Sequence, residues 1–191
     1  KAAATIGRRY EEMNFVICHL GTGISIAAHK QGKVVDMCDA RGEGPMSGDR
    51  AGGINSFLMM EFALSGQLTH DEIVKKIYSQ SGIAGHLGTK DIREVEQRIQ
   101  NGDEHAKLVL DAMIYQCAKE IGAQSAAISG KVDRIILTGG MTYSEYITKK
   151  LIAKVDFIAP VMVFPGEEEM EALALGALRV LMGKEEAKQY T

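Results

Sequence analysis

The sequence lacks the features of a disulfide-stabilised or membrane-spanning protein. Its 191 residues include only three cysteines, Cys18, Cys38 and Cys117, and no two of them have the Cys-x-x-Cys spacing of a metal or redox site. An odd number of widely spaced cysteines indicates reduced, buried thiols in a cytoplasmic protein and argues against zinc. No apolar run approaches the ~20 residues that cross a bilayer, so we expect no membrane segment.

The chain also lacks an excess of positive charge. It has 22 lysines and arginines against 25 acidic residues, a formal net charge of -3, and 46% hydrophobic residues. A slightly acidic chain offers no basic surface for nucleic acid or for an anionic membrane, so we expect neither as a partner. The length and composition are typical of a globular protein with one substantial core.

The spacing of apolar residues predicts an α/β fold. Residues 1–13 resemble the end of a helix, and three strands joined by short glycine-containing connections follow as antiparallel hairpins. The predicted strands are 14–20, 24–29, 33–38, 134–138 and 160–164. The predicted helices are 54–64, 69–78, 91–100, 103–129, 144–154 and 168–182, with a glycine-rich turn at 81–88. This βββαβαβα order predicts a mixed five-stranded sheet with helices on both faces and a helical insert.

Two glycine turns at strand ends are the most informative functional signal. The first, 21–23, follows the strand at 14–20, and the second, 139–140, follows the strand at 134–138. Glycines at the end of a buried strand let backbone N–H groups approach a phosphate without interference from a Cβ. Each turn alone also fits a plain hairpin, but two in one sheet predict a nucleotide held between them.

These elements resemble the ribonuclease H-like domain of the acetate kinase, sugar kinase, Hsp70 and actin superfamily. Within it, His19-Leu-Gly-Thr-Gly23 resembles the second phosphate motif of acetate and butyrate kinases, and Leu137-Thr-Gly-Gly-Met141 resembles their adenosine motif. The Gly-Glu-Gly-Pro at 42–45, followed by Gly-Asp-Arg-Ala-Gly-Gly at 48–53, is similar to the butyrate kinase branch of the acetokinase family, as is the segment 165–176. The resemblance covers essentially the whole chain.

The resemblance implies that 1–191 is a single C-terminal, ATP-binding ribonuclease H-like domain. Residues 1–13 would be the tail of a helix that links it to a missing N-terminal domain of the same fold, and the isolated fragment would be inactive. The implied reaction of the parent enzyme moves a phosphoryl group between ATP and butanoate, giving butanoyl phosphate and ADP, with Mg²⁺. An acetate, propionate or branched-chain fatty acid kinase, and a non-enzymatic nucleotide-binding domain like those of actin and Hsp70, remain alternatives.

The resemblance also implies catalytic roles for Arg50 and His19. A guanidinium matches the charge that spreads over the oxygens of a moving phosphoryl group, and a histidine at a strand end can hydrogen-bond the same oxygens. The backbone of Gly21, Thr22 and Gly23 would donate N–H groups to the β- and γ-phosphates. From the residues alone, Arg50 also fits a solvated loop arginine, and His19 a structural histidine.

A second group of residues is expected around the nucleoside. By resemblance, Gly139, Gly140 and Met141 flank the adenosine, Arg93 stacks on adenine, and Asp91 accepts a hydrogen bond from the ribose or the base. The competing interpretation of Asp91 and Arg93 is an acidic helix start beside an exposed charge.

The magnesium carboxylate is expected at the start of the last helix. Glu169 is the first choice and Glu168 the second, because Mg²⁺ often takes only one or two protein carboxylates. Acidic residues in a first turn also stabilise the helix dipole, which is explanation enough for most of them.

The apolar helix at 54–64 fits the core or a subunit interface, and we expect a homodimer or a larger homo-oligomer.

Overall fold

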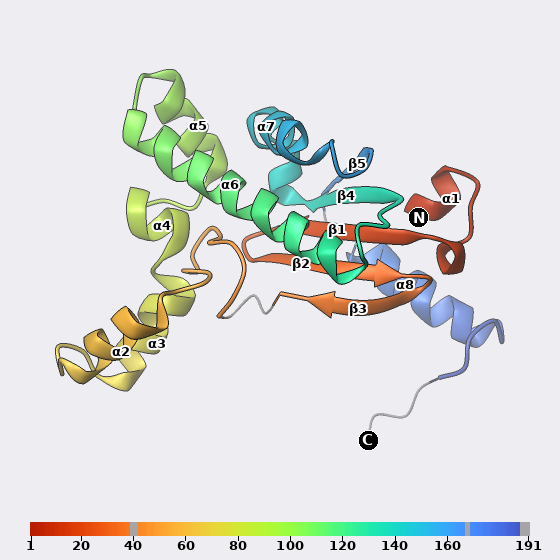
Figure 1. Ribbon diagram of the computed structural model, residues 1–191, viewed down its shortest axis with the longest axis horizontal. Helices are drawn as coiled ribbons and strands as arrows, with labels where there is room; N and C mark the ends of the chain where they lie inside the picture. Colours follow the sequence, from red (N-terminus) through yellow and green to blue (C-terminus); the bar gives the residue numbers. More distant parts are fainter. Residues whose placement is uncertain (39–41, 167–168, 188–191) are drawn as a thin grey trace.

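A five-stranded sheet forms the centre of the computed structural model, which describes residues 1–38, 42–166 and 169–187 (Figure 1). The strands are β1 (Asn14–Leu20), β2 (Ile24–Lys30), β3 (Lys33–Met37), β4 (Arg134–Gly139) and β5 (Val161–Pro165). Their order is β3-β2-β1-β4-β5. β2 is antiparallel to β1 and β3, whereas β4 is parallel to β1 and β5. The predicted mixed sheet is confirmed.

Helices cover both faces of the sheet. They are α1 (Ala2–Thr5), α2 (Ser56–Leu64), α3 (His70–Ser79), α4 (Gly82–Leu87), α5 (Ile92–Gln100), α6 (Glu104–Ala127), α7 (Glu145–Val155) and α8 (Glu169–Leu181). Two 3-10 turns, η1 (Tyr10–Glu12) and η2 (Gly140–Tyr143), complete the element order. In Figure 1 the long α6 crosses in front of the sheet and α8 lies behind it. No helix in the described part of the chain has the length and apolarity to cross a membrane.

Alternation along β1 divides its side chains between the two faces. Val16 and Cys18 are fully buried in the large core that includes the apolar residues of α6. Phe15 instead packs with Ala3 in a smaller cluster against the other face. Because successive side chains of a strand point to opposite faces, His19 lies on the same side as Phe15. All three cysteines are buried and unpaired, as the sequence predicts.

The segment expected to be a turn at 81–88 is a short helix, and that prediction is wrong. Gly82 begins α4 with φ +58, and a Cβ there would lie 2.2 Å from the carbonyl oxygen of Ser47. The N–H groups of Ile83 and Ala84 donate to the carbonyls of Ser47 and Gly48 at 2.9 and 2.8 Å. The first turn of α4 is therefore capped by a distant loop, which local sequence patterns do not reveal.

Helix α2 forms where an apolar helix is predicted, but it does not enter the core. Phe57 and Leu58 are each 60% exposed and Leu64 is 79% exposed. Together with α3, α2 extends away from the sheet (Figure 1). This helix was expected either in the core or at a subunit interface, and the structure excludes the core of the described chain.

Candidate functional site

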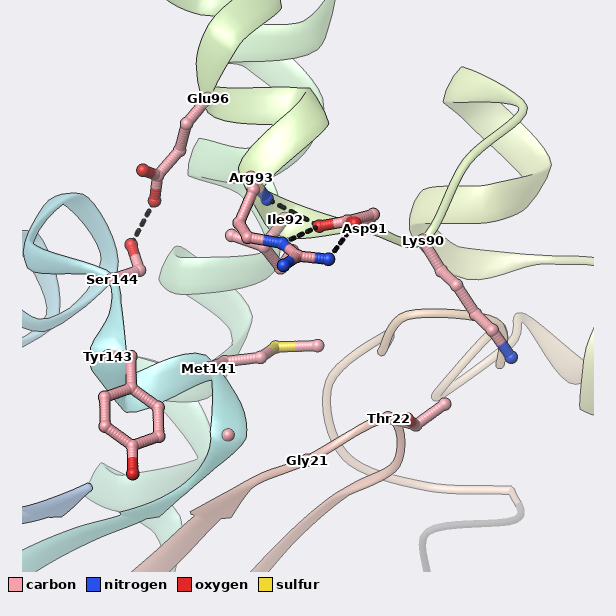
Figure 2. A pocket seen from close by; sticks show the side chains of 11 residues that line it. Gly21, Thr22, Lys90, Asp91, Ile92, Arg93, Glu96, Met141, Tyr143 and Ser144 are labelled. Carbon is pink, nitrogen blue, oxygen red and sulfur yellow. Dashed lines mark hydrogen bonds and ion pairs between the residues drawn. The ribbon is translucent and has the colours of Figure 1, made fainter. Parts of the chain in front are cut away.

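A hollow of about 600 Å³ lies where β1 and β4 end (Figure 2). Its size is within the ~300–1,000 Å³ range of small-molecule sites. It is lined by Gly21, Thr22, Lys90, Asp91, Ile92, Arg93, Glu96, Gly140, Met141, Tyr143 and Ser144. β1 and β4 are parallel neighbours, with His19 opposite Thr138, so their carboxyl ends reach the same edge of the sheet. Ligands of open α/β sheets bind at this edge.

The first glycine turn is held in place by the loop around Gly48. The N–H of Gly21 donates to the carbonyl of Gly23 at 3.1 Å, and the N–H of Gly48 donates to the carbonyl of Thr22 at 3.1 Å. A Cβ on Gly48 would lie 3.2 Å from that same oxygen, so the two segments are in close contact. Thr22 remains exposed on the wall of the hollow.

Arg50 lies against this turn. A Cβ added to Gly23 would be 2.9 Å from Nη1 of Arg50 and 3.1 Å from its Cζ. The backbone of Arg50 is fixed from both sides, because its N–H donates to Oγ of Ser47 at 3.3 Å and its carbonyl accepts from the N–H of Ser47 at 3.1 Å. The half-buried side chain is therefore packed beside the glycine turn, an arrangement unlike that of a solvated loop arginine.

The two glycines of the second turn have different environments. Gly139 has φ +99, and a Cβ there would lie 2.5 Å from the backbone of Leu20. It is therefore required where β4 packs on β1, and it does not line the hollow. A Cβ on Gly140 would meet nothing within 4 Å. Of the three residues expected to flank the adenosine, Gly140 and Met141 line the hollow and Gly139 does not, and their contact with a nucleotide remains a prediction.

Asp91 and Arg93 pair with each other at the start of α5. One carboxylate oxygen of Asp91 accepts from the backbone N–H and Nε of Arg93 at 3.0 and 2.9 Å, and the other accepts from Nη2 at 2.6 Å. The side-chain hydrogen bonds from Arg93 lower the pKa of Asp91 to about 2. The carboxylate expected to accept from the nucleoside is thus engaged in capping α5 and in orienting the guanidinium plane (Figure 2).

Two further charged residues of this region were missed by the sequence analysis. Nζ of Lys90 lies 3.0 Å from a carboxylate oxygen of Asp49 and so links the loop before α5 to the loop before Arg50. Glu96 accepts a hydrogen bond from the hydroxyl of Ser144 at the start of α7. A signal for Glu96 was present, since it follows Arg93 by three residues, a spacing that places both on one helix face.

The remaining predicted residues lie outside the hollow or outside the described residues. His19 is half-buried on β1 and does not line the hollow. Glu169 is the first residue of α8, but its side chain, like all of Glu168, falls outside the described residues. Within the described ranges, no group of three or more histidine, cysteine or acidic residues is placed to hold a metal ion.

The sheet order and the hollow at the carboxyl ends of β1 and β4 define an α/β, ribonuclease H-like domain. Comparison of sequences takes the assignment further. The chain belongs to the acetokinase family, whose profile matches residues 1–171.

Similar proteins include several carboxylate kinases. A probable butyrate kinase of Bacteroides thetaiotaomicron is 48% identical over 179 residues, covering 93% of this chain and 51% of the relative. The acetate kinase of Porphyromonas gingivalis has a TM-score of 0.85 and 28% identity, over 94% of this chain and 52% of that one. A propionate kinase of Francisella tularensis has a TM-score of 0.79 and 26% identity, over 88% and 50%. The chain therefore spans about half the length of these relatives.

Proposed function

We propose that this chain is the C-terminal, ATP-binding half of a cytoplasmic butyrate kinase, which transfers a phosphoryl group between ATP and butanoate. The position of Arg50 beside the 21–23 turn carries the proposal. A guanidinium packed on a glycine turn at the mouth of a hollow is suited to neutralising a phosphoryl group in transfer. The 48% identity to a probable butyrate kinase supports butanoate as the acceptor.

The charges of the hollow orient the nucleotide. Exposed Thr22 and the cation of Lys90 lie at one end, and Glu96 lies at the other (Figure 2). The phosphates are proposed to bind at the Thr22 end, beside the backbone of the turn and the Lys90 cation. Within this turn the Gly21 N–H is engaged by the carbonyl of Gly23, and Lys90 also pairs with Asp49. The nucleoside then extends over Met141, with the guanidinium plane of Arg93 as a stacking surface.

His19 and a magnesium ion complete the proposed chemistry. His19, at the end of β1, is the proposed donor of a hydrogen bond to the phosphoryl group in transfer. Mg²⁺ keeps several waters and needs only one or two protein carboxylates, so a single glutamate would be enough to hold it. Glu169 is the proposed carboxylate, with Glu168 as the alternative, and the ion would neutralise charge on the phosphates.

Two alternatives to a butyrate kinase are a kinase for a shorter carboxylate and a non-enzymatic nucleotide-binding domain. Likeness to an acetate kinase and a propionate kinase keeps shorter carboxylates as alternative acceptors. A non-enzymatic nucleotide-binding domain would have no need of Arg50 against the phosphate turn.

We also propose that the exposed apolar residues of α2 take part in a homodimer or a larger homo-oligomer, since such residues are normally buried against a partner.

The test uses this chain alone and joined to the N-terminal half of the Bacteroides relative. The isolated chain is expected to bind ADP in isothermal titration, but to give no acyl hydroxamate from butyrate, ATP and Mg²⁺. The joined protein is expected to give hydroxamate, and faster from butyrate than from acetate or propionate. Absence of ADP binding by the chain would contradict the nucleotide site, and turnover by the isolated chain would contradict its assignment as half of an enzyme.

A further inference from the structure

Glu96 and Ser144 close the end of the hollow that lies opposite the phosphate turn. Ser144 caps α7, because its Oγ accepts from the N–H of Ile147 at 3.0 Å. Its hydroxyl proton is donated to a carboxylate oxygen of Glu96 on α5 (Figure 2). A hydroxyl has one proton, so Ser144 has none left for a ligand. This bond instead fixes the position of the Glu96 carboxylate between the two helices.

The second carboxylate oxygen of Glu96 is available to a ligand. Among the residues that the structure describes, Ser144 is the one hydrogen-bond partner recorded for Glu96. In the other carboxylate that lines the hollow, Asp91, both oxygens already accept from Arg93. An ionised carboxylate only accepts hydrogen bonds, and a half-buried one is stabilised by a donor. A ligand group that hydrogen-bonds to Glu96 would therefore carry N–H or O–H.

The position of Glu96 indicates which part of a nucleotide it meets. Figure 2 shows Met141 between Thr22 on one side and Glu96 and Ser144 on the other. With phosphates at Thr22, the ribose follows over Met141 and the base reaches the end of the hollow. A carboxylate there also repels phosphate, which disfavours the reversed orientation. The donor that remains at this end is an amino group on the edge of the base.

We propose that Glu96 is a base-specificity residue, which accepts a hydrogen bond from the exocyclic amino group of a bound aminopurine nucleotide such as ADP. The inference rests on the proposed nucleotide site and extends it, because it assigns the choice of base to a residue outside the glycine turns and the Asp91–Arg93 pair. Ser144 is the positioning residue, since it holds Glu96 without touching the base.

The test compares nucleotides that differ by one group. Isothermal titration of this chain uses ADP, the diphosphate of purine riboside, which lacks only the amino group, and 2′-deoxy-ADP. A charge-assisted hydrogen bond is worth about tenfold or more in affinity, so the wild-type chain is expected to prefer ADP over the purine riboside diphosphate by that factor. Glu96→Gln, whose amide oxygen still accepts from Ser144 and whose NH₂ then faces the base, is expected to bring the two within about twofold.

Control variants distinguish recognition of the base by Glu96 from a purely structural role of this residue. Glu94→Gln alters an exposed carboxylate of the same helix that does not line the hollow, and it should retain the wild-type preference. If Glu96 only joined α5 to α7, Glu96→Gln would weaken ADP and the purine riboside diphosphate equally. Glu96→Ala provides the same comparison in a second variant, so that the proposal does not depend on the folding of one protein.

The possible results of these titrations lead to different conclusions. No ADP binding by the wild-type chain overturns the proposed nucleotide site and this inference together. ADP binding without a preference over the purine riboside diphosphate overturns the inference alone. A preference for ADP over 2′-deoxy-ADP that disappears in Glu96→Gln would show that Glu96 binds the ribose, which also overturns it.

Discussion

The guanidinium of Arg50 lies so close to Gly23 that a Cβ on Gly23 would be 2.9 Å from its Nη1. This contact joins the phosphate turn to a loop that is distant in the sequence. The loop is itself fixed by α4, whose Ile83 donates to the carbonyl of Ser47 at 2.9 Å. The position of the proposed catalytic cation thus depends on a glycine turn and a short helix together.

Gly23→Ala should displace Arg50 without unfolding the chain. Gly23 does not have a positive φ, so alanine fits its backbone, but the new methyl group would occupy space now taken by the guanidinium. In the joined enzyme we expect kcat to fall about tenfold or more, because misplacing a catalytic group is costly, while ADP affinity changes little. Steady-state kinetics and ADP titration measure both. The matched control is Gly42→Ala, where an added Cβ meets nothing within 4 Å.

Arg50→Lys should lower kcat by roughly two or more powers of ten in the joined enzyme, with a smaller effect on ADP affinity. Lysine keeps the charge but loses the planar fork that spans two phosphoryl oxygens. Hydroxamate kinetics and calorimetry on the same variant separate the two quantities. A kcat near that of the wild type would leave Arg50 without the proposed role.

Substitutions at Gly139 and Gly140 should have opposite consequences. Gly140→Val adds a side chain to open space at the hollow, so ADP affinity should fall by about tenfold or more while the circular dichroism spectrum stays native. Gly139→Ala forces a Cβ against the backbone of Leu20 at φ +99 and should lower the free energy of unfolding by about 3 kcal/mol. Normal ADP affinity in folded Gly140→Val would contradict the adenosine assignment.

The contribution of Asp91 to stability should disappear in acid. Its pKa is about 2 in the folded chain against an ordinary value of 3.8, because Arg93 favours the charged form. A lowered pKa stabilises the fold above the ordinary value, and this contribution is lost as pH falls from about 4 toward 2. Urea unfolding at pH 6 should therefore show Asp91→Asn less stable than the wild type, and the difference should shrink near pH 2.5. A difference that does not depend on pH would exclude the ion pair as its cause.

The sequence by itself determined the elements and the family. Most strands and helices appear within a few residues of their predicted bounds because their signals are local: alternation in β1, the Thr69 to Glu72 capping box that begins α3, and apolar spacing along α6. The exceptions are α4, for which the sequence predicts a turn, and the first helix, which is predicted over 1–13 but ends at Thr5. The glycine turns also lie at strand ends as expected, since glycine at such a position reflects a local backbone requirement.

Only the tertiary structure decided how these parts meet. α4 is a helix because a loop 36 residues earlier, at Ser47 and Gly48, satisfies the N–H groups of Ile83 and Ala84. Gly139 and Gly140 are adjacent in the sequence, and packing against Leu20 is what separates their roles. Glu96 meets Ser144 across 48 positions of the chain. The local sequence specifies dihedral preferences and faces, whereas partners brought together by chain folding depend on the packing of all the elements.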